Sequence, residues 1–158
     1  MKTLLGLVTA AFAVVLVSAG LASASTTVAW KATFSEPSGG PNHSPFTCAG
    51  DSCGSGEVTG LGQADDVVVF SDPYTFSDTR TLTFADGSTL VLYETVTNVQ
   101  TPGNSGNPRS YGNPITADLT DTIVGGTGRF AGATGSASGH LKFAGGTPVV
   151  TLRGTVTF

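Results

Sequence analysis

Positive charge is scarce in this chain. Of its 158 residues only seven are Lys or Arg, against eleven Asp or Glu, and the formal net charge at pH 7 is −4. A protein that binds DNA or RNA needs a basic patch to neutralise the phosphates, and the sequence contains none. We therefore expect no nucleic-acid partner.

Long hydrophobic runs are also lacking, apart from one near the N-terminus. The segment 4–17 is apolar except for Gly6 and Thr9, follows Lys2, and is followed by Ala-Ser-Ala at 22–24. It is short for a membrane-spanning helix, which needs ~20 apolar residues, and this order is typical of a secretory signal peptide. We expect cleavage after residue 24, which leaves 25–158 as one secreted, extracellular domain without membrane contact. A retained membrane anchor is the alternative.

Cysteine and histidine are rare, with two of each in the chain. A zinc site would have to combine Cys48 and Cys53 with His43 and His140, and thiols of an exported protein usually pair with each other instead. We therefore expect no metal and no cofactor. The sequence predicts a local disulfide between Cys48 and Cys53, with two free thiols as the alternative.

Helical periodicity is absent after residue 24. No segment keeps apolar residues at the three- and four-residue spacing of an amphipathic helix, whereas alternation of apolar and polar residues is frequent. This pattern predicts an all-β fold of antiparallel strands, each with one apolar face. The predicted strands lie within 26–34, 65–71, 79–96, 115–124, 137–143 and 150–158. Two segments rich in Gly, Pro, Asn and Ser, Ser35–Gly56 and Gln100–Pro114, are predicted as long irregular loops.

The clearest hairpin lies within 79–96, where Asp86-Gly87 marks the turn. A three-residue loop over 85–87, with Gly87 in the left-handed conformation, pairs Leu82 with Leu90. A two-residue loop would place leucine opposite threonine throughout the hairpin. We therefore predict the three-residue loop.

The glycine-rich stretch Gly126–Ala131 fits the pattern G-x-G-x-x-A of a dinucleotide-binding turn. That turn requires a helix after the glycines, and Gly132, Gly135 and Gly139 would each cost a helix ~1 kcal/mol. The acidic residue that binds the ribose is also missing, because no Asp or Glu follows Asp121. The stretch therefore indicates a corner between two strands.

The same stretch, "GGTGRFAGATGS" at Gly125–Ser136, resembles the bacterial secreted members of the allene oxide cyclase barrel-like and dirigent-like families. The segments "GEVTGLG", "LTFADGSTL" and "RGTVTF" support the resemblance, which spans 56–158, although Gly60 stands where the family often has His. The resemblance implies a single antiparallel, roughly eight-stranded closed barrel of the calycin-like kind. The long loops would then either cover its mouth or lie as plain surface loops.

In such a barrel the glycine-rich stretch is a structural corner. Gly125, Gly126 and Gly128 allow the chain to reverse with positive φ, Gly132 leaves room for a bent strand, and Phe130 is expected to plug the barrel end. The apolar faces would line the interior. The predicted lining residues are Trp30, Phe34, Leu82, Phe84, Leu90, Leu92, Leu119, Asp121 and Phe143.

Three charged residues fall on these apolar faces, namely Arg80, Glu94 and Asp121. A charge there is costly unless it is paired or lies at a wet mouth. We expect Glu94 to lie near Arg80, towards the end opposite the Gly87 turn, and Asp121 to lie nearer the glycine-rich corner.

Three functions remain open at this point. The first is a secreted barrel that binds or orients a small apolar molecule without catalysing its reaction, as the resemblance to dirigent proteins implies. The second is a cofactor-free cyclase or isomerase of the allene oxide cyclase type, with Glu94 as the catalytic carboxylate and Arg80 tuning it. The third is a packed structural barrel without a ligand, in which the two residues form a structural pair. A homo-oligomer is compatible with the sequence but is not indicated by it.

Overall fold

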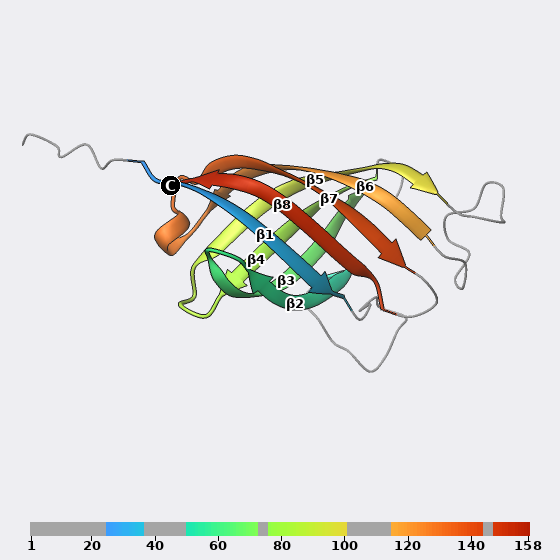
Figure 1. The fold of residues 1–158 in the computed structure, drawn as a ribbon, viewed down its shortest axis with the longest axis horizontal. Helices are drawn as coiled ribbons and strands as arrows, with labels where there is room; N and C mark the ends of the chain where they lie inside the picture. The colour runs from blue at the N-terminus through green and yellow to red at the C-terminus, as the bar shows by residue number, and fades with distance from the viewer. Residues whose placement is uncertain (1–24, 37–49, 73–75, 101–114, 144–146) are drawn as a thin grey trace, which may run out of the picture.

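A computed structural model describes residues 25–36, 50–72, 76–100, 115–143 and 147–158. The described chain forms eight antiparallel strands that close into a barrel, as the sequence predicts (Figure 1). The strands are β1 (Thr27–Ser35), β2 (Ser52–Val58), β3 (Gly62–Asp72), β4 (Ser77–Phe84), β5 (Thr89–Gln100), β6 (Ile115–Gly126), β7 (Thr134–Phe143) and β8 (Val149–Thr157). A single 3-10 turn, η1 (Gly128–Phe130), stands between β6 and β7.

The strands follow one another around the barrel in sequence order, and β8 pairs with β1 to close it. This last pairing runs from Thr27 opposite Thr157 to Ser35 opposite Val149. Closure gives every strand a paired neighbour on both sides, with β1 and β2 pairing at Ala32–Val58 and Ser35–Ser55, and so limits the usual route to edge-to-edge aggregation. It also means that every second residue of each strand points into one shared interior.

The hairpin of β4 and β5 has the predicted register. Leu82 lies opposite Leu90, and the backbone N–H of Phe84 donates to the carbonyl oxygen of Ser88 at 2.9 Å. Gly87 has a φ of 78° and its N–H donates to the carbonyl of Phe84, which closes the three-residue loop. The turn is encoded locally, because only this loop length keeps leucines paired with leucines.

The glycine-rich corner carries the turn η1 in place of a simple strand-to-strand bend. Gly128 has a φ of 59°, and a side chain there would collide with Ser88. Phe130 is fully buried, with its ring centroid 4.9 Å from that of Phe84 and 5.1 Å from that of Phe158. The aromatic ring therefore closes this end of the barrel, as predicted.

The prediction of an irregular loop throughout Ser35–Gly56 is wrong, because β2 begins at Ser52. A side chain at Gly54 or Gly56 would collide with the backbone carbonyl of Ser35 or Thr33 on β1. These glycines allow two backbones to approach closely, whereas in sequence they are typical of a loop.

Several sequence predictions fall outside the described residues. These are the signal peptide at 1–24, most of the loop Gln100–Pro114, and Cys48. Cys53 lies in β2 and is not a free thiol. Because Cys48 lies outside the described residues, the disulfide between them stays a prediction. No helix among the described residues is long and apolar enough to cross a membrane.

The barrel interior divides into two regions along its length. Around η1 the core is apolar and contains Phe84, Leu61, Val58 and Phe130. The strands β1, β3, β5 and β7 all end at the opposite side (Figure 1). Towards that side the inner face becomes polar, and the charged residues predicted to face inward lie there.

Candidate functional site

Strand alternation brings one guanidinium group and five carboxyl groups into the barrel interior. The central strand of the site is β4, in which buried and less buried positions alternate. We call the guanidinium and the five carboxyl groups the interior polar cluster, and each of these residues is at most 4 % exposed. Its members are Glu36 directly after β1, Asp66 on β3, Asp78 and Arg80 on β4, Glu94 on β5 and Asp121 on β6.

Arg80 lies at the centre of the cluster and contacts three of the carboxylates. Its Nε donates to Glu94 Oε2 at 3.0 Å and its second terminal nitrogen donates to Glu94 Oε1 at 3.4 Å, so this pair is bidentate. The other terminal nitrogen donates to Glu36 Oε1 at 2.8 Å and also to Asp66. Glu36 is held further by the Ser52 hydroxyl, which donates to Oε2 at 2.8 Å. The predicted proximity of Arg80 and Glu94 is therefore observed.

The remaining carboxyl groups form a row across three strands. Asp78 lies directly opposite Glu94, and Glu94 lies directly opposite Asp121. Side chains in such positions have Cβ atoms ~4.5–5.5 Å apart, and like charges there repel each other. One guanidinium cannot neutralise five buried carboxylates, so part of the cluster must be protonated at neutral pH.

The pKa values of the aspartates agree with this charge balance. Burial raises the pKa of Asp66 to about 8, against the opposing effect of the Arg80 charge. Burial, reinforced by the nearby Glu94 charge, raises the pKa of Asp78 and of Asp121 to about 8 as well. Burial disfavours the charge on Arg80, but the surrounding carboxylates outweigh it and raise the arginine pKa. The cluster thus combines a permanent cation with carboxyl groups that exchange protons near neutral pH.

Several buried polar atoms of the interior have no hydrogen-bond partner among the described residues. They include the indole Nε1 of Trp30, both carboxyl oxygens of Asp121, and one oxygen each of Asp66 and Asp78. For the aspartates the neighbouring groups are themselves acidic, Glu36 beside Asp66 and Glu94 beside Asp78 and Asp121, so a hydrogen bond there requires a shared proton. A buried polar group without a partner is costly, and native proteins keep very few of them. These atoms mark the part of the interior where buried polar groups do not all find hydrogen-bond partners within the protein.

The expected position of Asp121 near the glycine-rich corner, apart from Glu94, is wrong. The two residues are cross-strand neighbours. The pairing of Leu90 with Gly126 brings β5 and β6 together at the corner, and Asp121 is then displaced along β6 about as far as Glu94 is along β5. The sequence specifies how far each residue lies from its own turn but not the register between β5 and β6, which brings the two residues together.

Most residues predicted to line the interior are buried there. Trp30, Phe34, Leu82, Phe84, Leu90, Leu92 and Leu119 pack together in the core, and Asp121 lies beside them. Phe143 differs, since it is only half-buried at the last position of β7. The corner residues Gly125, Gly126, Gly128 and Gly132 surround η1, and Phe130 is buried. The prediction of a positive φ is wrong for Gly126, which is required because a side chain there would collide with Thr89 and Phe130.

Sequence reasoning missed three members of the cluster, namely Glu36, Asp66 and Asp78. Two of them carried a readable signal. Asp78 precedes Arg80 by two positions and so shares its face of β4, and Asp66 alternates with Ala64 and Val68 on β3. Their meeting at one arginine depends on the register between β3 and β4, which no local pattern specifies.

Among the described residues no group of three or more His, Cys, Asp or Glu side chains has an arrangement that could hold a metal ion. The interior polar cluster offers hydrogen bonding, charge stabilisation and proton exchange. Comparisons of the chain with protein-family models, with curated proteins and with solved structures found no match.

Proposed function

We propose that the barrel interior binds a small, largely apolar molecule whose hydrogen-bond-donating end reaches the interior polar cluster. The observation that carries this proposal is Asp121, which is 1 % exposed and accepts no hydrogen bond from an N–H or hydroxyl group of the described residues, its polar neighbour being the acidic Glu94. A protein retains such a group at a cost, and a ligand that donates a hydrogen bond to it removes that cost. The apolar side chains around the cluster account for the rest of the ligand's surface.

A second candidate is the cofactor-free cyclase or isomerase. It is favoured by the aspartate pKa values of about 8, because an acid or base is most effective when its pKa lies near the working pH. In this case Asp121 would exchange a proton with the substrate, and Glu94, positioned by Arg80, would stabilise developing positive charge. Turnover that is lost in Glu94→Gln while binding persists would favour this candidate over a barrel that only binds.

Trp30 offers a direct probe of the interior. It is the only tryptophan of the chain and is buried. Small residues separate it from Asp121 on the inner face, since Asp121 lies opposite Ala137, Ala137 opposite Gly154, and Gly154 opposite Trp30. A ligand that contacts Asp121 should therefore change the fluorescence of Trp30.

The test compares two probes of the same shape, 1-aminoanthracene and anthracene, of which only the first carries an N–H donor. We expect 1-aminoanthracene to quench Trp30 fluorescence with an affinity about tenfold higher, the factor that one hydrogen bond to a charged or strongly polar group supplies. Asp121→Leu should abolish this preference, and it should fold at least as well because it replaces a buried acidic group beside Glu94 with an apolar side chain.

Asp118→Leu is the matched control, because Asp118 lies on the same strand but is exposed on the outer face. It should keep the preference of the wild type. Equal affinity of the wild type for both probes, or no quenching by either, would contradict the proposed function.

A further inference from the structure

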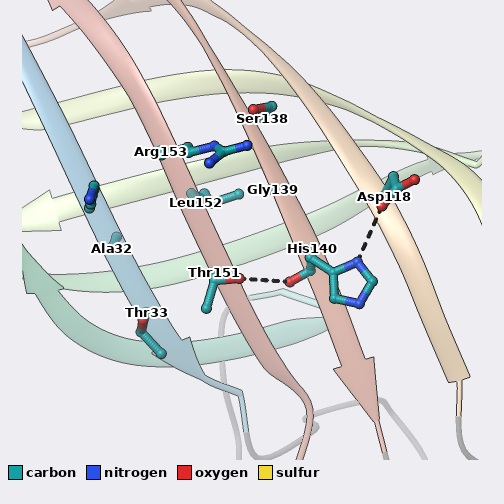
Figure 2. Close-up of a pocket in the computed structure, with 10 residues that line it drawn as sticks. Ala32, Thr33, Asp118, Ser138, Gly139, His140, Thr151, Leu152 and Arg153 are labelled. Carbon is teal, nitrogen blue, oxygen red and sulfur yellow. Dashed lines mark hydrogen bonds and ion pairs between the residues drawn. The ribbon is translucent and has the colours of Figure 1, made fainter.

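A second polar site lies outside the barrel, separate from the interior polar cluster. The outer faces of β6, β7, β8 and β1 form a groove of about 480 Å³. Its lining includes Lys31. Figure 2 labels further polar side chains of the lining, namely Thr33, Ser138, His140, Thr151 and Arg153. The outer groove is thus lined by cationic and hydroxyl groups, in a protein whose net charge is negative.

Two cations face each other at one side of this groove. Lys31 on β1 lies directly opposite Arg153 on β8. In the same ladder Thr26 and Phe158 exchange both backbone hydrogen bonds, at 2.8 Å and 3.0 Å. Because hydrogen-bonded and non-hydrogen-bonded pairs alternate, Lys31 and Arg153 form a non-hydrogen-bonded pair, in which the two Cα atoms are only ~4.5 Å apart. Like charges in this position destabilise a sheet.

No carboxylate of the described residues forms an ion pair with either cation. Arg80 is paired inside the barrel and Arg129 is paired with Asp86 at 3.6 Å. The described lysines and arginines that remain without an ion pair are Lys31, Lys142 and Arg153, and all of them lie on β1, β7 and β8. The unneutralised positive charge of the described surface is therefore concentrated on this side of the barrel.

The opposite side of the groove has a different character. Asp118 on β6 contacts His140 Nδ1 at 3.2 Å and accepts a hydrogen bond from Asn98 at 2.8 Å. These hydrogen bonds, from Asn98 first and then from His140, lower the pKa of Asp118. The strands β7 and β8 lie between Asp118 on β6 and Lys31 on β1, so this carboxylate does not neutralise the cation pair.

We propose that the outer groove binds the oxyanion group of a small molecule, a carboxylate, sulfate or phosphate, between Lys31 and Arg153. The planar guanidinium of Arg153 can bind two oxygens of such a group, and Lys31 adds a point charge. The hydroxyls of Ser138, which lies opposite Arg153, and of Thr33 stand beside the cations as further donors. An oxyanion here would remove the repulsion between two cations that the fold holds face to face.

The test uses the full chain and inorganic phosphate, titrated by NMR or calorimetry at an ionic strength kept constant with chloride. Lys31→Gln and Arg153→Gln should each weaken phosphate binding about tenfold, as expected for the loss of one charge-assisted hydrogen-bonding partner. Lys142→Gln is the matched control, because Lys142 is an exposed cation on β7 that does not line the groove. It should change the affinity by less than about twofold.

Titrations with sulfate and with acetate distinguish the oxyanion classes, and saturable binding of any of the three through the same two residues supports the proposal. A second measurement does not depend on the probe. At low ionic strength without added oxyanion, Arg153→Gln should unfold at a higher temperature than the wild type, because it relieves the repulsion with Lys31. Absence of binding for all three anions, or equal weakening by Lys142→Gln, would overturn the proposal.

Discussion

Arg80 is the residue on which the charge balance of the interior depends. It is the only buried cation among the described residues, and it contacts Glu36, Asp66 and Glu94. A buried ion pair contributes little net stability against an apolar pair of the same volume, but loss of one partner leaves an uncompensated charge. Without the positive charge of Arg80, the carboxylates inside the barrel would destabilise the fold.

A double-mutant cycle over Arg80→Met and Glu94→Gln measures this dependence. We expect Arg80→Met to destabilise the fold by about 3–5 kcal/mol, because it leaves Glu94 buried without its bidentate partner. The double variant should cost less than Arg80→Met alone. Urea unfolding at fixed pH gives the free energies. Effects that add within ~0.3–0.5 kcal/mol would mean that the two side chains do not interact.

At the level of single residues the sequence indicated part of this cluster. Arg80 and Glu94 were predictable because the hairpin register places both on a face occupied by leucines. Glu36 was not, because it lies beyond the end of β1 and reaches Arg80 only after the barrel closes. The contact between Glu36 and Arg80 joins two segments that no single turn connects. It forms because the barrel closes, and no local sequence pattern predicts it.

The corner between β6 and β7 is the element whose sequence is most restrictive. Gly128 combines a positive φ with a close approach to Ser88, whose hydroxyl accepts a hydrogen bond from the N–H of Arg129 at 3.2 Å. Both constraints together allow only glycine. Gly132, in contrast, has a φ of 76° with open space around its Cα.

These two glycines form a matched pair of tests. Gly128→Ala should destabilise the protein by ~1–3 kcal/mol, because a Cβ there is strained and also displaces Ser88. Gly132→Ala should cost less, about 1 kcal/mol, because only the backbone conformation is unfavourable. Thermal or urea unfolding of both variants provides the comparison. Equal costs would show that the contact with Ser88 is unimportant.

Among the elements, the hairpin was predictable and β2 was not. The β4–β5 turn is specified by its own residues, Asp86 and Gly87, and by leucine pairing within a few positions. In β2 the residues Gly54 and Gly56 carry no strand signal, and their role appears only when β1 lies against them. Glycine is required at these positions because the backbone of β1, which is distant in sequence, lies too close to leave room for a side chain.

At the scale of the whole molecule, the protein is a closed barrel with one apolar end and one acidic interior region. An interior with several carboxyl groups and one guanidinium stays folded only if protons neutralise part of it. Proton uptake by the folded state is therefore a property of the entire barrel. The stability of the molecule must then depend on pH in a direction opposite to ordinary acid denaturation.

The dependence of stability on pH tests this account of the interior most directly. Asp66, Asp78 and Asp121 have pKa values of about 8 in the folded protein, against 3.8 for an ordinary aspartate. Between these values the folded state binds protons that the unfolded state has released, so raising the pH removes stability until the carboxyl groups ionise in the folded protein. Urea unfolding between pH 5 and pH 9, above the range in which Asp86 and Asp118 titrate, should show a fall in the free energy of unfolding that levels off above about pH 8. Asp121→Asn should make this fall shallower, because Asp66 and Asp78 still bind protons. A free energy that is constant or rises over this range would contradict the account, because it would mean that the interior carboxyl groups are already ionised in the folded barrel.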